Sequence, residues 1–221
     1  MNYCLSKRIS SICLVCCALC LSAFAARPFV TDDAGTVESG KFELEAACEY
    51  LNPDISTGIN LKHGITERMD FNIGLGCLPS AIHQHEQVFF PADIAVKYAL
   101  VPNLLAMSFG TCLGDETYNV NAVITKFFGS IECDANLGYQ IQSSMKNADL
   151  TYGMATVYEF SRLGVGAEVY GSNDDLTWWQ VGARFAVREW IKIDAGIGSS
   201  FEKTPSYTVT TGLWCTFPFN K

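Results

Sequence analysis

The chain has 221 residues, of which 49% are hydrophobic and only 17% are charged, and this length suits a single domain of ordinary size. It contains 15 basic and 23 acidic residues, a net charge of −8 at pH 7. Nucleic-acid-binding proteins present basic surfaces to the phosphates of their ligand, so we expect no nucleic-acid partner.

The first 25 residues have the features of a secretory signal peptide. Lys7 and Arg8 precede an apolar stretch over residues 9–24, and residues 23–25 have the small-x-small pattern of a cleavage site. An N-terminal anchor helix is the alternative, but the stretch is short for spanning a bilayer. We therefore predict a signal peptide over residues 1–25. Without its two cations, 13 basic residues remain against 23 acidic ones, a balance that favours cationic solutes in any pore.

The cysteines do not predict a disulfide framework. Five of the ten fall in the predicted leader, and the other five are an odd number without a C-x-x-C pair, which argues against complete pairing and against a zinc site. Four of these five fall in step with apolar residues, where a cysteine acts as a small hydrophobic side chain. The five are Cys48, Cys77, Cys112, Cys133 and Cys215.

Past residue 40 the dominant hydrophobic period is two, and no stretch has the continuous apolar length of a transmembrane helix. Segments of about ten residues, separated by turn residues, have the length of tilted strands that cross a bilayer. We predict an all-β fold, an antiparallel transmembrane outer-membrane β-barrel of about twelve strands over residues 41–219. The predicted strands cover residues 41–50, 58–63, 69–77, 93–100, 104–112, 119–124, 131–140, 150–159, 163–170, 180–187, 191–198 and 207–217.

The lengths of the connections predict the orientation of the barrel. Short turns alternate with longer polar segments, as they do between the two ends of an outer-membrane barrel. This alternation places the short turns, and an N-terminal segment over residues 26–40, in the periplasm. The short turns cover residues 64–67, 101–103, 128–130, 161–162 and 187–189, and the longer segments cover residues 78–90, 142–149, 171–175 and 200–205.

The polar face of the predicted strands carries most of the charge. In residues 41–50, for example, Glu43 and Glu45 alternate with Phe42 and Leu44. Two interpretations remain open, a paired polar core that fills the barrel and an acidic, cation-preferring channel. The candidate lumen residues are Glu43, Glu45, Asp70, Asp93, Lys97, Glu132, Asp134, Glu159, Glu168, Arg184, Lys192 and Asp194.

The run from Arg27 to Glu45 resembles the opening of a known bacterial family. It reads RPFVTDDAGTVESGKFELE, similar to the R-P-x-x-T-D-D-A-G-T-V-E-x-G-x-x-E-L-E run of outer-membrane transporters described as proteins of the meta-pathway of phenol degradation. Residues 64–71, GITERMDF, are similar to the family's second hairpin. The resemblance implies an outer-membrane barrel that moves small, aromatic or hydrophobic compounds. The chain departs from the usual pattern at its end, where Asn220 and Lys221 follow the terminal aromatic Phe219.

Asp32 and Asp33 lie in this run, before the first strand. They could belong to a periplasmic plug or to a cation site at the pore mouth. The simpler alternative is a hydrogen-bonded turn, which short carboxylates favour. The sequence leaves both interpretations open.

No motif indicates an enzyme, a cofactor or a metal site. A phosphate loop and a nucleophile elbow are both lacking, His63 has no obvious serine partner, and His83 and His85 fit a solvated loop better than a metal site. We predict a passive channel for small solutes in the outer membrane, with outer-membrane lipid and the barrel insertion machinery as partners. The alternatives are a closed structural or surface-interaction barrel and, less favoured, a secreted soluble β-protein.

Overall fold

The computed structural model describes residues 28–51, 54–78, 88–89, 92–113, 117–142, 148–173 and 177–218. The predicted signal peptide, His83 and His85 of the longest connection, and the three C-terminal residues lie outside this part of the chain.

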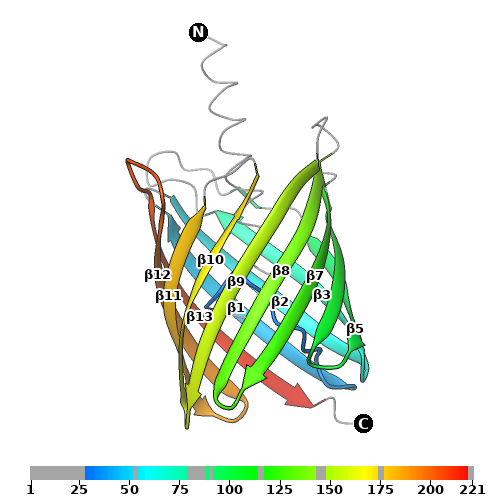
Figure 1. Ribbon diagram of the computed structural model, residues 1–221. Coiled ribbons are helices and arrows are strands. Elements are labelled where there is room, and N and C mark those ends of the chain that lie inside the picture. Colours follow the sequence, from blue (N-terminus) through cyan, green and yellow to red (C-terminus); the bar gives the residue numbers. More distant parts are fainter. Residues whose placement is uncertain are drawn as a thin grey trace.

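Within the described residues, twelve long strands form a closed antiparallel barrel (Figure 1). Strands that follow one another in the chain pair with one another, and the first and last strands close the wall, from Lys41 opposite Pro218 to Leu51 opposite Thr208. A two-residue strand, β4, pairs with the end of β3. The predicted fold class and strand number are confirmed. The strands are β1 (Lys41–Leu51), β2 (Asp54–Thr66), β3 (Met69–Leu78), β4 (Val88–Phe89), β5 (Asp93–Val101), β6 (Leu105–Cys112), β7 (Thr117–Phe128), β8 (Ile131–Gln142), β9 (Ala148–Phe160), β10 (Leu163–Ser172), β11 (Trp178–Arg188), β12 (Ile191–Ser200) and β13 (Tyr207–Pro218).

The alternation in the sequence becomes an outer and an inner face. On β7, Ile124 is 51% exposed while its neighbour Val123 is fully buried. Large apolar side chains such as Leu75 and Met154 are exposed around the outside. A soluble protein rarely leaves so many apolar side chains in water, whereas lipid chains surround such a belt on a membrane barrel. No helix in the described part of the chain is both long and apolar enough to cross a membrane.

The structure also fixes the register that the sequence left undecided on β6. Met107 and Phe109 are exposed on the outside, and Ala106 is buried inside. Cys112, on the same face as Ala106, is buried as well. Cys48, Cys133 and Cys215 are free thiols, whereas Cys112 is an inner-face residue rather than part of the outer surface.

Short turns join the strands at one end of the barrel, called the short-turn end from here on. The β2–β3 turn is shorter than expected, because Gly64 continues β2, which runs to Thr66. Gly129 and Ser161 adopt positive φ values of 64° and 57° in the tight turns after β7 and β9, a conformation that two-residue hairpins require.

The N-terminal segment is not part of the barrel wall, which begins with β1 at Lys41. Residues 28–40 run inside the barrel, where the dark-blue chain is visible behind the front strands (Figure 1). The sequence of residues 26–40 has no strand period, and a plug was only one of two open interpretations of Asp32 and Asp33. The acceptors that bind the segment come from strands far along the chain, as described next.

Candidate functional site: the occupied lumen

Residues 28–40, called the lumen segment from here on, line the inner wall without forming a long strand. Ala34 is fully buried in a cluster with Ala106 of β6 and Val123 of β7. Phe29, near the other end of the segment, is 6% exposed. Because the segment has no strand neighbour of its own, its backbone polar groups need partners from the wall.

Glu168 of β10 binds the N-terminal end of the lumen segment. Its carboxylate oxygens accept hydrogen bonds from the backbone N–H of Val30, at 2.8 and 3.0 Å, and of Thr31, at 2.8 Å. Gln180 of β11 donates its side-chain amide to the carbonyl of Pro28. A carboxylate that is only 3% exposed is stabilised by such charge-assisted bonds.

Side chains of β7 and β8 act as a substitute strand for the middle of the segment. Asn136 accepts the backbone N–H of Asp32 and donates to the carbonyl of the same residue, both at 2.8 Å. Two facing residues exchange the same pair of bonds in an antiparallel sheet. Thr125 accepts the N–H of Ala34 at 2.8 Å and donates its own proton to Asp134 at 2.6 Å.

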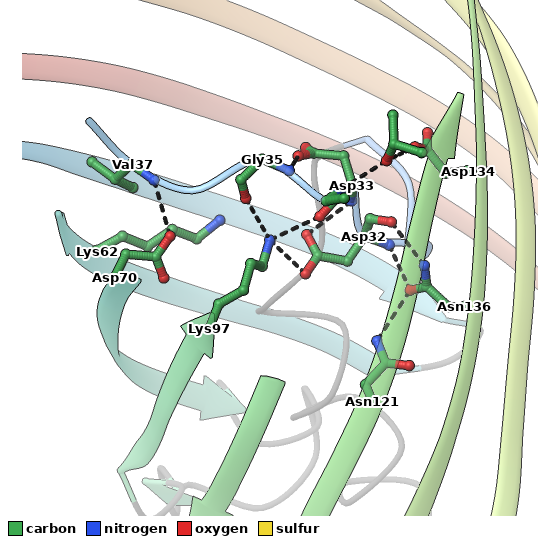
Figure 2. A network of polar contacts seen from close by, with 12 residues as sticks. Asp32, Asp33, Gly35, Val37, Lys62, Asp70, Lys97, Asn121, Asp134 and Asn136 are labelled. Carbon is green, nitrogen blue, oxygen red and sulfur yellow. Dashed lines mark hydrogen bonds and ion pairs between the residues drawn. The ribbon is translucent and has the colours of Figure 1, made fainter. Parts of the chain in front are cut away.

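Lys97 of β5 is at the centre of the charged contacts, as Figure 2 shows. Its ammonium group lies 2.8 Å from the carboxylate of Asp32 and donates to the carbonyls of Asp33 and Gly35, at 3.0 and 3.2 Å. A lysine has three N–H donors, and these three partners use all of them. The carboxylate of Asp33 instead accepts the N–H of Gly35 at 2.6 Å. Asp33 therefore forms the hydrogen-bonded turn that the sequence allowed, while Asp32 holds the segment inside the barrel through Lys97.

Burial perturbs the acid–base chemistry of Asp32. Loss of hydration raises the pKa of this carboxyl group from 3.8 to about 6, and the charge of Lys97 opposes the shift. The nearby charge of Asp33 adds to it. Asp32 is therefore a group of the lumen segment whose charge changes at mildly acidic pH.

The C-terminal end of the lumen segment is bound near the short-turn end. Asp70 of β3 accepts the N–H of Val37 at 2.9 Å. Ser39 forms a single parallel bridge with Gly64 of β2, and the carbonyl of Gly64 accepts the N–H of Gly40 at 2.8 Å. Gly40 has a φ of 76°, which a glycine adopts without strain, and this turn directs the chain into β1.

Glycines on the inner wall make room for the segment. A Cβ atom at any of three positions on β9, β10 and β11 would lie between 2.6 and 2.8 Å from an atom of the segment, closer than non-bonded atoms approach. The wall is therefore shaped to the segment as well as hydrogen-bonded to it. Gly153 faces Thr31, Gly166 faces Phe29, and Gly182 faces Pro28.

A second buried ion pair joins β1 and β2. The ammonium of Lys62 lies 2.9 Å from Glu45, and Asn60 donates to the same carboxylate at 3.2 Å. Glu45 is 3% exposed. Charge pairing and hydrogen bonding together offset the cost of burying this carboxylate.

Charged groups near the short-turn end are less buried. Arg184 and Glu159 form an ion pair at 2.7 Å, with side chains that are 26% and 40% exposed. The ammonium of Lys192 lies 4.2 Å from the ring centroid of Trp214, within range of a cation–π contact. This end of the lumen therefore presents both signs of charge to water.

The predicted lumen residues all lie on barrel strands, and eight of the twelve take part in the contacts described above. Asp93 and Asp194 are buried, each at 5% exposure, while Glu43 and Glu132 are partly exposed. The role of these residues in solute passage stays a prediction.

The sequence prediction missed Lys62, and it missed Thr125 and Asn136 as binding residues. Lys62 was recoverable, because Asn60 and Lys62 alternate with apolar neighbours, so that extending the period of β2 places Lys62 on the inner face. For Thr125 and Asn136 no local signal exists, since their function depends on the chain that lies against them.

The fold is similar to that of solved outer-membrane channels. A KdgM porin in complex with disordered oligogalacturonate has a TM-score of 0.63 at 9% identity, over 79% of this chain and 99% of that chain. The COG4313 outer membrane channel from Pseudomonas putida F1 has a TM-score of 0.57 at 12% identity, over 84% and 98% of the two chains. The NanC porin has a TM-score of 0.57 at 8% identity, over 78% of this chain and 98% of that chain. No family model matches the chain, and no curated protein matches it. The comparisons thus show the fold of outer-membrane β-barrel channels.

Proposed function

We propose that this protein is an outer-membrane channel for small solutes whose passage is narrowed by its own N-terminal segment. The observation that carries the proposal is the position of residues 28–40 inside the barrel, bound by inward-facing carboxylates and by Lys97. The fold and the apolar outer surface support a location in the outer membrane, in contact with its lipid, after export directed by residues 1–25 and assembly by the barrel insertion machinery.

The proposed solutes are small and preferably cationic or neutral. Inward-facing acidic side chains outnumber the inward-facing cations, and rings of carboxylates favour cations in a pore. Several of these carboxylates accept backbone N–H groups of the lumen segment, however, so we expect a weak preference rather than a strong one. The resemblance of residues 27–45 to the transporter family extends the proposal to aromatic or hydrophobic solutes.

A second candidate function is a closed structural or surface-interaction barrel. Complete burial of Ala34 between β6 and β7 favours it, because a segment packed this closely fills part of the lumen. In this case the inward charges form a paired polar core and conduct nothing.

Conductance in a planar lipid bilayer separates the two candidates. We expect small, cation-preferring currents from the full protein and larger currents after deletion of residues 28–37. Heat-modifiable mobility on a semi-native gel checks that the deletion variant still folds. A folded deletion variant without conductance would establish the closed barrel, and a preference for anions would reject the acidic channel.

We also propose that the protein is not an enzyme. His63, the histidine considered as a base, stacks on Phe42 with ring centroids 4.2 Å apart, and its Nδ1 lies 3.1 Å from the carbonyl of Lys41. Its strand position alternates with Lys62, which faces inward, so His63 is on the outer face. The outer face is in contact with lipid in this proposal, where no water reaches a hydrolytic site.

A further inference from the structure

The inner wall binds the lumen segment chiefly through the backbone of the segment. Glu168 accepts the N–H groups of Val30 and Thr31, and Asn136 both accepts from and donates to the backbone of Asp32. Every polypeptide has such N–H and C=O groups, whatever its side chains. These contacts are therefore ones that another extended chain can make.

The backbone contacts continue across the barrel from strand to strand. Gln180 of β11 donates to the carbonyl of Pro28, and Asp70 of β3 accepts the N–H of Val37. Between these two ends, the partners come from β10, β8, β7 and β5. The bound stretch thus covers residues 28–37, which is the length of an oligopeptide rather than of a single amino acid.

The wall selects the side chains of the segment most strictly at two positions. The carboxylate of Asp32 lies 2.8 Å from the ammonium of Lys97, which points from β5 towards the segment in Figure 2. Ala34 is fully buried in its cluster with Ala106 and Val123, so a larger side chain would not fit there. A chain that binds this wall therefore needs a carboxylate and, two residues later, a small side chain.

We propose that this wall is a binding site for extended oligopeptides, which residues 28–37 occupy as an intramolecular ligand. The peptides carry an aspartate two residues before a small residue. They carry few other negative charges, because Glu168, Asp70 and Asp134 place carboxylates on the same wall and like charges repel. Passage of such peptides through the barrel rests on the proposed function, whereas their binding to the wall does not.

The covalent link favours the segment over a peptide in solution. A ligand joined to its site by a short linker has an effective concentration of roughly millimolar, and only residues 38–40 separate the bound stretch from β1. An added peptide should therefore displace the segment only at comparable concentrations. The segment thus acts as an autoinhibitor of the peptide site.

Competition in the full-length protein is the first test. A synthetic peptide with the sequence of residues 28–37, PFVTDDAGTV, is added to the membrane-inserted barrel, and maleimide labelling of a thiol introduced by Val37→Cys reports displacement of the segment. We expect labelling to accelerate by roughly tenfold or more at millimolar peptide and then to level off. A scrambled peptide of the same composition is the control. Equal acceleration by the scrambled peptide would overturn the proposal.

Direct binding to an emptied wall is the second test. Ala34→Leu in the full chain should release the segment, since leucine does not fit between Ala106 and Val123, and it leaves every residue of the wall unchanged. Heat-modifiable mobility checks that this variant folds, and labelling of Val37→Cys checks that its segment is released. We expect a fluorescent form of the peptide to bind the variant roughly tenfold or more tightly than it binds the parent protein. Absence of binding to a folded variant with a released segment would overturn the proposal.

Changes to the peptide test individual contacts with the Ala34→Leu barrel. N-methylation at Val30 removes the N–H that Glu168 accepts, and Asp32→Asn removes the charge that Lys97 meets. Each change should weaken binding by roughly tenfold or more, the loss expected for a bond to a charged group. A Val30→Thr peptide, which keeps the N–H and the shape of the side chain, is the control.

A double-mutant cycle tests whether the peptide occupies the position of the segment. When Lys97→Met is added to the Ala34→Leu barrel, the Asp32→Asn peptide should bind as well as the parent peptide, because the partner of its carboxylate is gone. An equal loss in the barrels with and without Lys97 would show that the peptide binds elsewhere and would overturn the proposal.

Conductance separates failure of this proposal from failure of the proposed function. A barrel that binds the peptide without conducting ions would support the binding site and reject the channel. A barrel that conducts ions but does not bind the peptide would overturn the binding site and leave the channel.

Discussion

Replacement of Lys97 by methionine tests whether the lumen segment is held by charge. The substitution keeps the approximate length of the side chain but removes the ammonium that contacts Asp32 at 2.8 Å and the carbonyls of Asp33 and Gly35 at 3.0 and 3.2 Å. Both members of the ion pair are largely removed from water, with side chains 12% and 10% exposed. Removing one partner of a buried pair costs about 3–5 kcal/mol, because the other charge is left uncompensated.

This cost applies to the state in which the segment is bound, since a released Asp32 regains its hydration. Each 1.4 kcal/mol is a factor of ten in an equilibrium constant, so the ratio of bound to released segment should fall by roughly two to three and a half orders of magnitude. Two measurements report release of the segment in the Lys97→Met variant. Single-channel conductance should be larger, and a thiol introduced by Val37→Cys, called the segment probe below, should react faster with a maleimide. Val37 is 5% exposed in the bound state.

Lys126→Met is the matched control for Lys97→Met. Lys126 is exposed on β7, and its neighbour Thr125, which binds the segment, is buried on the other face, so the substitution removes one positive charge without touching the segment. Conductance and labelling of the control should equal those of the parent protein. A folded Lys97→Met barrel with parental conductance and labelling would refute the role of charge in holding the segment.

Three further predictions concern other contacts of the segment. Glu168→Gln removes the charge that accepts hydrogen bonds from the two backbone N–H groups of Val30 and Thr31, and a hydrogen bond to a charged group is worth about 1.5–3 kcal/mol. We expect at least tenfold faster labelling of the segment probe, and parental labelling would contradict this. Gly166→Val places methyl groups where the ring of Phe29 lies, so the segment should be displaced while Ala167→Val, on the outer face, has no effect. Burial raises the pKa of Asp32 from 3.8 to about 6, so between these pH values the bound segment holds a proton on Asp32 that the released segment does not. Binding of the segment therefore weakens by up to ~3 kcal/mol as pH rises from 3.8 through 6. Conductance should rise over the same range, and Asp32→Asn should remove this dependence on pH.

The strands were predictable because the alternation of polar and apolar residues within each strand indicates which face meets the lumen and which meets lipid. On β8, for instance, Glu132 and Asp134 alternate with Cys133 and Ala135, and a period of two with polar and apolar faces describes a wall between two media. Only β6 lacked this contrast, since Ala106 and Met107 are both apolar. Its register came from the neighbours in the sheet, which a single strand does not encode.

The position of the lumen segment was not predictable for a related reason. Asp32 binds Lys97 of β5 and Asn136 of β8, at separations along the chain that only the closed barrel brings together. The turn chemistry of the Asp32-Asp33 pair was visible in the sequence, and Asp33 does accept the N–H of Gly35. Local chemistry therefore predicted the hydrogen bond of Asp33, whereas a plug was only one of two open interpretations and the partners of Asp32 across the lumen could not be predicted from the sequence.

The acidity of the lumen has a structural cause that is separate from solute selectivity. A segment without a strand partner presents backbone N–H groups, and each one buried against the wall needs an acceptor. Glu168 and Asp70 supply such acceptors directly, and Asp134 accepts the proton of Thr125, which frees the threonine oxygen to accept the N–H of Ala34. Negative charge on the inner wall is thus required by the segment itself, and its excess over the inward cations does not by itself measure a preference for cationic solutes. In the proposed channel, a solute would meet the partly exposed groups near the short-turn end, where Arg184 and Lys192 accompany the carboxylates.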